Sequence, residues 1–526
     1  MSTLTGTMHL ARLNVRRDRV RLAVWLAALT GLLAATTAGI KSLYPTAADL
    51  AGYAETAGSS PAATALNGPG HAVDTAGGAT VFEVGGYLSV AVALMSVLII
   101  GRCTRAEEES GRLELLRANV LGRHAALAAA VIVMVAMNIA VGTAVAAIMT
   151  AFDVSAAGAA TFGAALAGIG IVFGAVAAVT SQITEHVRGS NAIAGTVVAA
   201  AYVIRAAGDV GETGLSWLSP FGWVQATRPF ADERWWPLLI ALGAAALLVA
   251  MAVALQNRRD VGAGLVPQRP GPASASPTLL HQVGFSLRLQ RASLIGWTVG
   301  VFLGGLAFGS VAREMEDIVA ESDDLQEWVS AYGANPTEAF LALTLLLLSL
   351  AAAGCAIASA LRITSEESAG RAEPILATPL SRPAWLLSHL VAPLAAAIVV
   401  PVAGGLGTGI AYGILTSDAE QIPRLAGAAM AHVPAVWLLT AATVLLIGLL
   451  PRLAVTAWAI LAGCVVAAML GSLIRLPDWV LELSPFEHTP RLPGGSMDVA
   501  ASLTLTGLAA AVIVVGVVSF RRRDVR

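Results

Sequence analysis

The sequence predicts an all-α polytopic membrane protein with about 12 spans, arranged as two parallel six-helix transmembrane repeats. Of the 526 residues, 56% are hydrophobic and 13% are charged, against roughly 25% charged in an ordinary soluble domain. Mean hydropathy is +0.74, and uncharged runs long enough to cross a bilayer recur along the chain. This composition excludes a disordered protein, a disulfide-rich secreted scaffold and a nucleic-acid binder with a basic face.

The apolar runs form two sets of six. Each run is expected to be a helix, because a span in lipid must satisfy its own backbone hydrogen bonds. The first set covers about 22–40, 84–101, 125–151, 159–182, 190–207 and 238–256. The second set covers about 292–312, 338–361, 385–415, 425–449, 453–474 and 499–520.

The arginines predict the orientation. Most of them fall on one side if both termini are cytoplasmic, as the positive-inside rule favours. The acidic loop at 313–336 then lies outside. The Arg, Ala, Gly and Val content is typical of a high-GC bacterial genome, so we expect a multi-pass protein of the bacterial plasma membrane. The first span is not taken as a signal peptide, because the same arginine-rich lead recurs in mid-chain before 292.

Three motifs occur twice, about 265 residues apart. They are E-E-x-x-G-R-x-E at 107–114 and 366–373, L-S-P-F at 218–221 and 483–486, and R-R-D-V at 258–261 and 522–525. An even number of spans per half makes the repeats parallel. The chain is therefore predicted to be a fused pseudo-dimer of halves 1–256 and 282–526. A Pro-rich cytoplasmic linker at 257–281 joins them.

The E-E-x-x-G-R-x-E motifs lie in the only sizeable cytoplasmic loops predicted inside each half. Each loop is expected to be a short charged helix, with Gly111 or Gly370 allowing a close backbone approach. Such a helix can dock into another protein and pass movement to the spans. The alternative is an ordinary solvated loop, which the repetition at the same place in both halves disfavours.

Three other features have both a functional and a structural interpretation. The stretches 8–21 and 282–292 fit amphipathic helices in the membrane interface, or simple positive-inside anchors. The outer segments 213–237 and 477–497 suit an aromatic belt, or a re-entrant turn at Ser-Pro-Phe. Ionisable residues such as Arg205 lie at predicted span ends, whereas His432 lies about two turns into its span. A lone histidine there is more often hydrogen-bonded structure than a proton relay.

No catalytic or metal-ligating motif is present in the sequence, and neither is a phosphate-binding loop. That loop needs a lysine, and the single lysine, Lys41, lies outside at a span end. We therefore expect no enzyme activity and no cofactor in this chain. If ATP drives the protein, ATP and Mg²⁺ must be bound by another chain.

The two six-span halves with their duplicated charged loops resemble the type-two ABC exporter permeases, and most closely the fused exporters of polyketide antibiotics. The resemblance implies a fold with cytoplasmic coupling helices that contact two copies of a separately encoded ATP-binding subunit. It implies export of hydrophobic small molecules. The implied coupling residues are Glu107, Glu108, Gly111, Arg112, Glu114, Glu366, Glu367, Gly370, Arg371 and Glu373.

The resemblance also implies a substrate pathway between the second and fifth spans of both halves. The candidate residues there are Val90, Leu94, Val97, Val197, Ala201, Leu345, Ser349, Trp458 and Ala462. Two alternatives stay open. A proton-coupled secondary transporter needs a charged relay inside the spans, which the sequence lacks. A non-transporting membrane scaffold or sensor does not require the duplicated loop motif.

Overall fold

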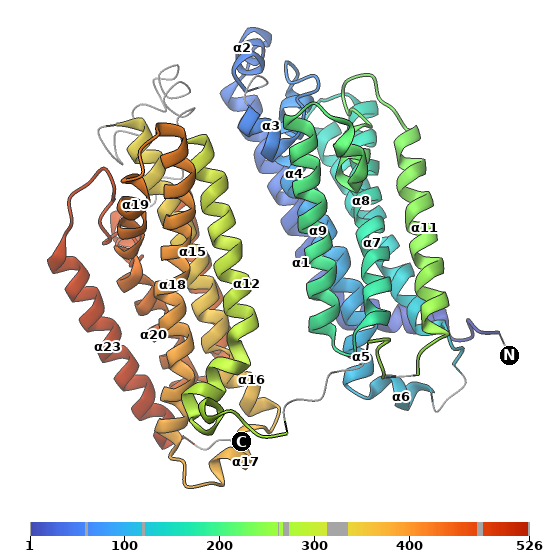
Figure 1. Ribbon diagram of the computed structural model, residues 1–526. Helices are drawn as coiled ribbons and strands as arrows, with labels where there is room; N and C mark the ends of the chain where they lie inside the picture. The colour runs from blue at the N-terminus through green and yellow to red at the C-terminus, as the bar shows by residue number, and fades with distance from the viewer. Residues whose placement is uncertain are drawn as a thin grey trace. The chain divides into compact units, whose positions relative to one another are not determined.

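The computed structural model describes residues 2–57, 61–117, 121–260, 262–266, 273–312, 335–470 and 477–523. The chain divides into two compact units, Met1–Gly271 and Pro272–Arg526 (Figure 1). Within the described residues all regular structure is helical, and 12 helices are long and apolar enough to cross a membrane. The predicted all-α, multi-span fold is confirmed. Residues 313–334 of the predicted acidic loop, 261 and 267–272 of the predicted linker, and 471–474 of the predicted eleventh span lie outside the described residues.

The first unit contains six long helices and several short ones. The long helices are α1 (Thr7–Leu43), α4 (Ala76–Cys103), α7 (Ala125–Ala151), α8 (Ala156–Ile183), α9 (Val187–Val210) and α11 (Trp236–Gln256). The short ones are α2 (Ala47–Ala57), α3 (Pro61–Asn67), α5 (Arg105–Glu109), α6 (Arg112–Arg117), the 3-10 helix η1 (Gly214–Leu218) and α10 (Pro220–Gln225).

The second unit is also built of long helices joined by short ones. Its longer helices are α12 (Gln282–Val311), α15 (Pro336–Ala360), α18 (Arg382–Thr416), α19 (Gln421–Met430), α20 (Val433–Leu449), α21 (Ala457–Leu470) and α23 (Val499–Arg522). Its short helices are η2 (Pro277–Leu280), α16 (Arg362–Ser368), α17 (Ala372–Leu376), η3 (Pro451–Thr456) and α22 (Asp478–Leu481).

The first predicted span and the stretch before it form one helix, not two. Helix α1 runs unbroken from Thr7 to Leu43, because no proline or glycine interrupts the sequence before Gly31. Helix α12 likewise begins at Gln282 and continues through the seventh span. In Figure 1 the dark-blue start of α1 lies across the end of the first unit that carries α5 and α6. The stretches 8–21 and 282–292 are therefore the starting parts of long helices rather than separate helices. Their place in a membrane interface stays a prediction.

The same pairs of long helices pack in each unit. The first packs on the third and the fourth on the sixth, which are α1 with α7 and α8 with α11 in the first unit. The corresponding pairs in the second unit are α12 with α18 and α20 with α23. Glycines bring neighbouring backbones together: a Cβ on Gly142 of α7 would lie 2.4 Å from the carbonyl oxygen of Gly163 of α8. Helices in lipid associate through such small-residue contacts.

The predicted tenth span is broken at His432. Helix α19 ends at Met430 and α20 begins at Val433, and Pro434 at the start of α20 suits a new helix rather than the middle of an old one. The hydropathy of 425–449 predicts that His432 lies two turns into a continuous span. In the structure it lies instead between two helices. It is fully buried at the break, where its Nδ1 lies 2.9 Å from the Thr489 hydroxyl.

Candidate functional site

Each charged motif folds into two short helices around a glycine turn. The first motif supplies α5 and α6, and the second supplies α16 and α17. Gly111 and Gly370 occupy the turns with φ values of +70° and +68°. A Cβ at either position would meet no atom within 4 Å. The predicted single helix and the predicted close approach are therefore wrong, and glycine is needed here for its left-handed backbone conformation.

The first glutamate of each motif pairs back across this turn with the arginine of the same motif. Glu366 accepts from Arg371 at 2.6 Å, and Arg362 lies 3.2 Å from its other oxygen. In the first unit Arg112 lies 3.9 Å from Glu107. Arg17 of α1 approaches Glu107 more closely, at 2.5 Å. The turn is thus closed by a salt bridge between residues five apart in the sequence.

The second glutamate of each motif pairs with the R-R-D-V motif that follows the last helix of its unit. Arg259 donates to both carboxylate oxygens of Glu108, at 2.7 and 2.9 Å. Arg523 donates to both oxygens of Glu367, at 2.7 and 2.6 Å. The Glu108 and Arg259 side chains are 6% and 5% exposed, and the Glu367 side chain is 8% exposed. We call these two ion pairs the latches.

The first latch is surrounded by further hydrogen bonds. Arg105, which is fully buried, donates to Glu108 at 2.8 Å and to the carbonyls of Ser181 and Ala263. The Nε of Arg259 donates to the Gln182 side chain at 2.7 Å. The loop after α4, the end of α8 and the segment after α11 are therefore held at one point. Charge-assisted bidentate pairs of this kind fix geometry as well as energy.

The second latch is enclosed differently. Arg382, at the start of α18, donates to the Arg523 carbonyl at 2.7 Å. The guanidinium of Arg523 also lies over the Phe520 ring, 4.7 Å from its centre. The remaining residues of the second R-R-D-V motif, Asp524 and Val525, lie outside the described residues, as does Val261 of the first.

The other predicted coupling residues face outward. Arg112 and Arg371 have side chains that are 63% and 57% exposed, and Glu114 and Glu373 are also exposed. Glu109 stands where the second copy of the motif has Ser368. Its carboxylate accepts a hydrogen bond from the backbone N–H of Val187 at 2.6 Å. Each motif therefore divides into an enclosed pair of glutamates and an exposed arginine and glutamate.

The predicted pathway residues differ in their exposure within each unit. Val97, Ala201, Leu345 and Ser349 are buried, and Val90 is half-buried. Leu94, Val197, Trp458 and Ala462 are exposed on their helices. Their place on the predicted pathway stays a prediction.

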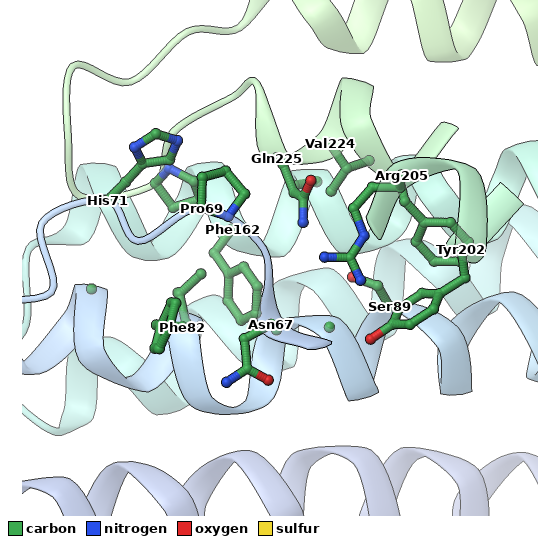
Figure 2. Close-up of a pocket in the computed structure, with 17 residues that line it drawn as sticks. Asn67, Pro69, His71, Phe82, Ser89, Phe162, Tyr202, Arg205, Val224 and Gln225 are labelled. Carbon is green, nitrogen blue, oxygen red and sulfur yellow. The ribbon is translucent and has the colours of Figure 1, made fainter. Parts of the chain in front are cut away.

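A pocket lies between the second and fifth long helices of the first unit, which are the two spans that the resemblance assigns to the substrate pathway (Figure 2). It is at the end of the unit away from α5 and α6. Tyr202 and Arg205 of α9 line it, together with Phe82 and Ser89 of α4 and Gln225 of α10. Of the residues that line the pocket, the sequence singled out only Arg205, as a charge at the end of a predicted span.

Two apolar helical bundles, each with a charged turn, define a multi-pass membrane protein. The family model described as "Multidrug efflux system permease Rv1217c, C-terminal domain" matches residues 9–255 and 279–521. The multidrug efflux system permease protein Rv1217c of Mycobacterium tuberculosis (strain ATCC 25618 / H37Rv) is 41% identical over 529 residues, which cover 100% of this chain and 96% of that protein. The chain belongs to this permease family, and the resemblance to fused two-half exporter permeases is confirmed.

Proposed function

We propose that the chain is the membrane-spanning subunit of an ATP-driven exporter of hydrophobic small molecules. Two copies of a separately encoded ATP-binding subunit, which hold the ATP and Mg²⁺, bind the α5–α6 and α16–α17 turns. The turns and both termini then lie on the cytoplasmic face of a bacterial plasma membrane. The latches carry this proposal, because the same charged turn is fixed to the last helix in each unit.

Each motif has exposed residues and enclosed glutamates, and this division suggests how movement of the ATP-binding subunits would reach the membrane-spanning helices. The residues Arg112 and Glu114, and Arg371 and Glu373 in the second unit, are exposed and accessible to a partner, and the two arginines also pair with the first glutamate of their motif. The enclosed glutamates hold the turn rigidly to the long helices. Closure of the ATP-binding subunits would then move the second and last long helices of each unit together. ATP can shift the transporter between states only through its different affinity for each state.

Two observations support hydrophobic small molecules as the substrate class: the name of the 41% identical relative and the side chains of the membrane-spanning helices. The relative is named a multidrug efflux permease, and the helices of this chain present apolar, small and hydroxyl-bearing side chains. A pathway along the second and fifth long helices suits greasy compounds. It offers no chain of acids for proton coupling in the described spans, which disfavours the secondary transporter.

The test uses the full chain co-expressed with the ATP-binding subunit of a neighbouring reading frame. Inside-out vesicles should accumulate a hydrophobic dye such as Hoechst 33342 when ATP is added, and accumulation should persist after the proton gradient is collapsed. Dependence on the gradient rather than on ATP would support the secondary transporter instead. A chain that purifies alone and transports nothing would support the scaffold.

Charge reversal at the exposed glutamates tests the docking surface. E114R combined with E373R should lower the yield of co-purified ATP-binding subunit and the ATP-dependent uptake, each by about tenfold, if like charges then meet across the interface. E482R is the matched control, since Glu482 is an exposed glutamate beside α22, away from the turns. Equal loss in the control would contradict a specific role for the turns.

A further inference from the structure

A second and larger pocket of the first unit lies beside α1, at the α5 end of α4 and α9. Its volume is about 360 Å3, whereas roughly 10–15 Å3 suffices for one water. Arg102 near the end of α4 and Asn191 near the start of α9 are among the residues that line it. The pocket in Figure 2 lies at the other ends of these two helices, so the two cavities are separate.

Helix α1 presents a polar face to this pocket. Asn14, Asp18, Arg21 and Trp25 line the pocket, and their spacing of three or four residues places them on one side of the helix. Asn14 is only 7% exposed, yet its amide makes no hydrogen bond within the described part of the chain. Both amide atoms keep accessible surface. Because buried polar groups normally have a partner, this amide is available to a ligand in the pocket.

Two arginines at the pocket are oriented by one carboxylate. The Nε of Arg102 donates to Asp18 at 2.7 Å, and an Nη of Arg21 lies 3.7 Å from the same oxygen. The Asp18 side chain is 10% exposed, whereas those of Arg21 and Arg102 are 62% and 37% exposed. The other N–H groups of both guanidiniums make no hydrogen bond to a described residue. A bound anion can therefore reach them.

The charges beside the pocket are unequal. Asp18 also accepts from Arg17 at 3.1 Å, and Arg17 pairs in turn with Glu107 at 2.5 Å. Three guanidiniums thus face two carboxylates, which leaves an excess of positive charge. Arginine side chains match the oxygens of a phosphate group in geometry as well as in charge. Basic pockets between membrane-spanning helices are suited to anionic lipid headgroups.

The remaining wall of the pocket is apolar and continues out of it. Leu22 and Leu98 line the pocket, and Leu98 is 45% exposed. One turn further along α4, Leu94 is 38% exposed. A phosphate held by Arg102 is therefore followed, one and two helical turns away, by exposed leucines. This arrangement suits a ligand with a phosphate and long apolar chains better than it suits a free phosphate ion.

The second unit has different residues at the corresponding positions. Counted from the tryptophan shared by α1 and α12, and from the charged motif, the residues in place of Asp18, Arg21 and Arg102 are Gln290, Ser293 and Leu361. The acid and both arginines are thus absent from these positions. Gln290 instead accepts a hydrogen bond from Ser359. The basic pocket is therefore expected in the first unit alone.

We propose that this pocket binds the phosphate of an anionic glycerophospholipid. The accessible N–H groups of Arg21 and Arg102 donate to the phosphate oxygens, and the Asn14 amide binds the polar part of the headgroup. The acyl chains run along the leucines of α4. The inference requires the chain to lie in a membrane, but it does not rest on the proposed export function.

Native mass spectrometry of the full, delipidated chain in detergent tests the proposal. Dioleoylphosphatidylglycerol and dioleoylglycerol are titrated separately, because they share their acyl chains and only the first carries a phosphate. The wild-type chain should bind the phospholipid about tenfold more tightly, the scale of a hydrogen bond to a charged donor. Equal binding of the two lipids would overturn the proposal. Displacement of the phospholipid by an equal concentration of inorganic phosphate would assign the site to a free anion, and would overturn it as well.

Matched variants identify the pocket among other lipid contacts. R21Q should weaken phosphatidylglycerol binding about tenfold and leave dioleoylglycerol binding unchanged. R19Q is the control, since Arg19 is an exposed arginine of the same helix that does not line the pocket. Lipids bound elsewhere contribute equally to both variants. Equal affinities for phosphatidylglycerol in R21Q and R19Q would contradict the proposal.

A double variant extends the test. R21Q combined with R102Q should lower phosphatidylglycerol binding to the level of dioleoylglycerol, because both phosphate donors are then lost. If this variant does not fold, R21Q alone decides, since Arg21 is exposed and only loosely paired with Asp18. A folded double variant that still prefers the phospholipid as the wild-type chain does would overturn the proposal.

Discussion

Glu108 and Arg259 lie 151 residues apart in the chain and are joined by two hydrogen bonds of 2.9 and 2.7 Å. Glu367 and Arg523 repeat this relationship in the second unit. Two motifs that are separate in the sequence are thus one structural device. Each latch ties the turn after the second long helix to the end of the sixth.

This pairing changes how the coupling residues are tested. Glu108 and Glu367 are enclosed, so reversing their charge would place two arginines together inside each unit. The effect on ATP hydrolysis would then mix lost contact with lost structure. The exposed Glu114 and Glu373 are the better positions for testing partner binding.

The first prediction concerns the latch itself. E108Q should destabilise the first unit by about 3–5 kcal/mol, because it leaves the buried guanidinium groups of Arg105 and Arg259 without their carboxylate. R259Q should cost less, because Glu108 keeps its ion pair with Arg105. The double variant should cost less than the sum of the two single variants. These losses of stability are measured by heating the detergent-solubilised chain and recording, by size-exclusion chromatography, how much folded protein remains at each temperature. Strictly additive losses would mean that the two side chains do not interact.

The second prediction concerns the glycine turns. G111A and G370A should each destabilise their turn by about 1–2 kcal/mol, because a residue with a Cβ strains the left-handed conformation. G195A is the control: Gly195 lies within α9 with open space around it, so alanine should be neutral or stabilising by up to about 1 kcal/mol. Wild-type stability in G111A would show that the turn tolerates another backbone conformation.

The third prediction concerns the contact between α7 and α8. G142A should lower stability by about 1–3 kcal/mol, because its Cβ would press on the Gly163 carbonyl and force the helices apart. G243A, in a part of α11 with no atom near the glycine, provides the comparison. An unfolding temperature as high in G142A as in G243A would show that α7 and α8 can shift without cost.

Much of the fold could be predicted from the sequence because lipid imposes a strong pattern. Apolar runs of span length located the twelve long helical segments, and the repeated motifs located both charged turns. The break at His432 was missed because the residues on both sides of it are apolar, so hydropathy shows one continuous run. The turn conformation of Gly111 was missed because glycine serves both close approach and left-handed backbone.

The candidate sites were harder to predict. The sequence shows two adjacent glutamates at the start of one repeated motif and two adjacent arginines at the start of another, but not which of them meet. Only the fold shows that the second of each, Glu108 and Arg259, face one another. Arg205 lies near the end of α9, as the sequence indicates, and Asp209 follows it by one helical turn. The Leu66 carbonyl of α3, which also accepts from Arg205, could be identified only from tertiary structure.

The last prediction concerns pH and the loop between α3 and α4. Burial, with the nearby charges of Arg228 and Arg234, lowers the pKa of His71 below its ordinary value of 6.5. Below pH 6.5 the unfolded chain therefore binds more protons than the folded chain, so acidification destabilises the fold. The loss should be at most about 1.4 kcal/mol per pH unit from this group. Unfolding temperatures at pH 7.5 and 5.5 should converge in H71Q, whereas H9Q, at an exposed position, should keep the wild-type difference. An unchanged difference in H71Q would show that His71 is not the group responsible.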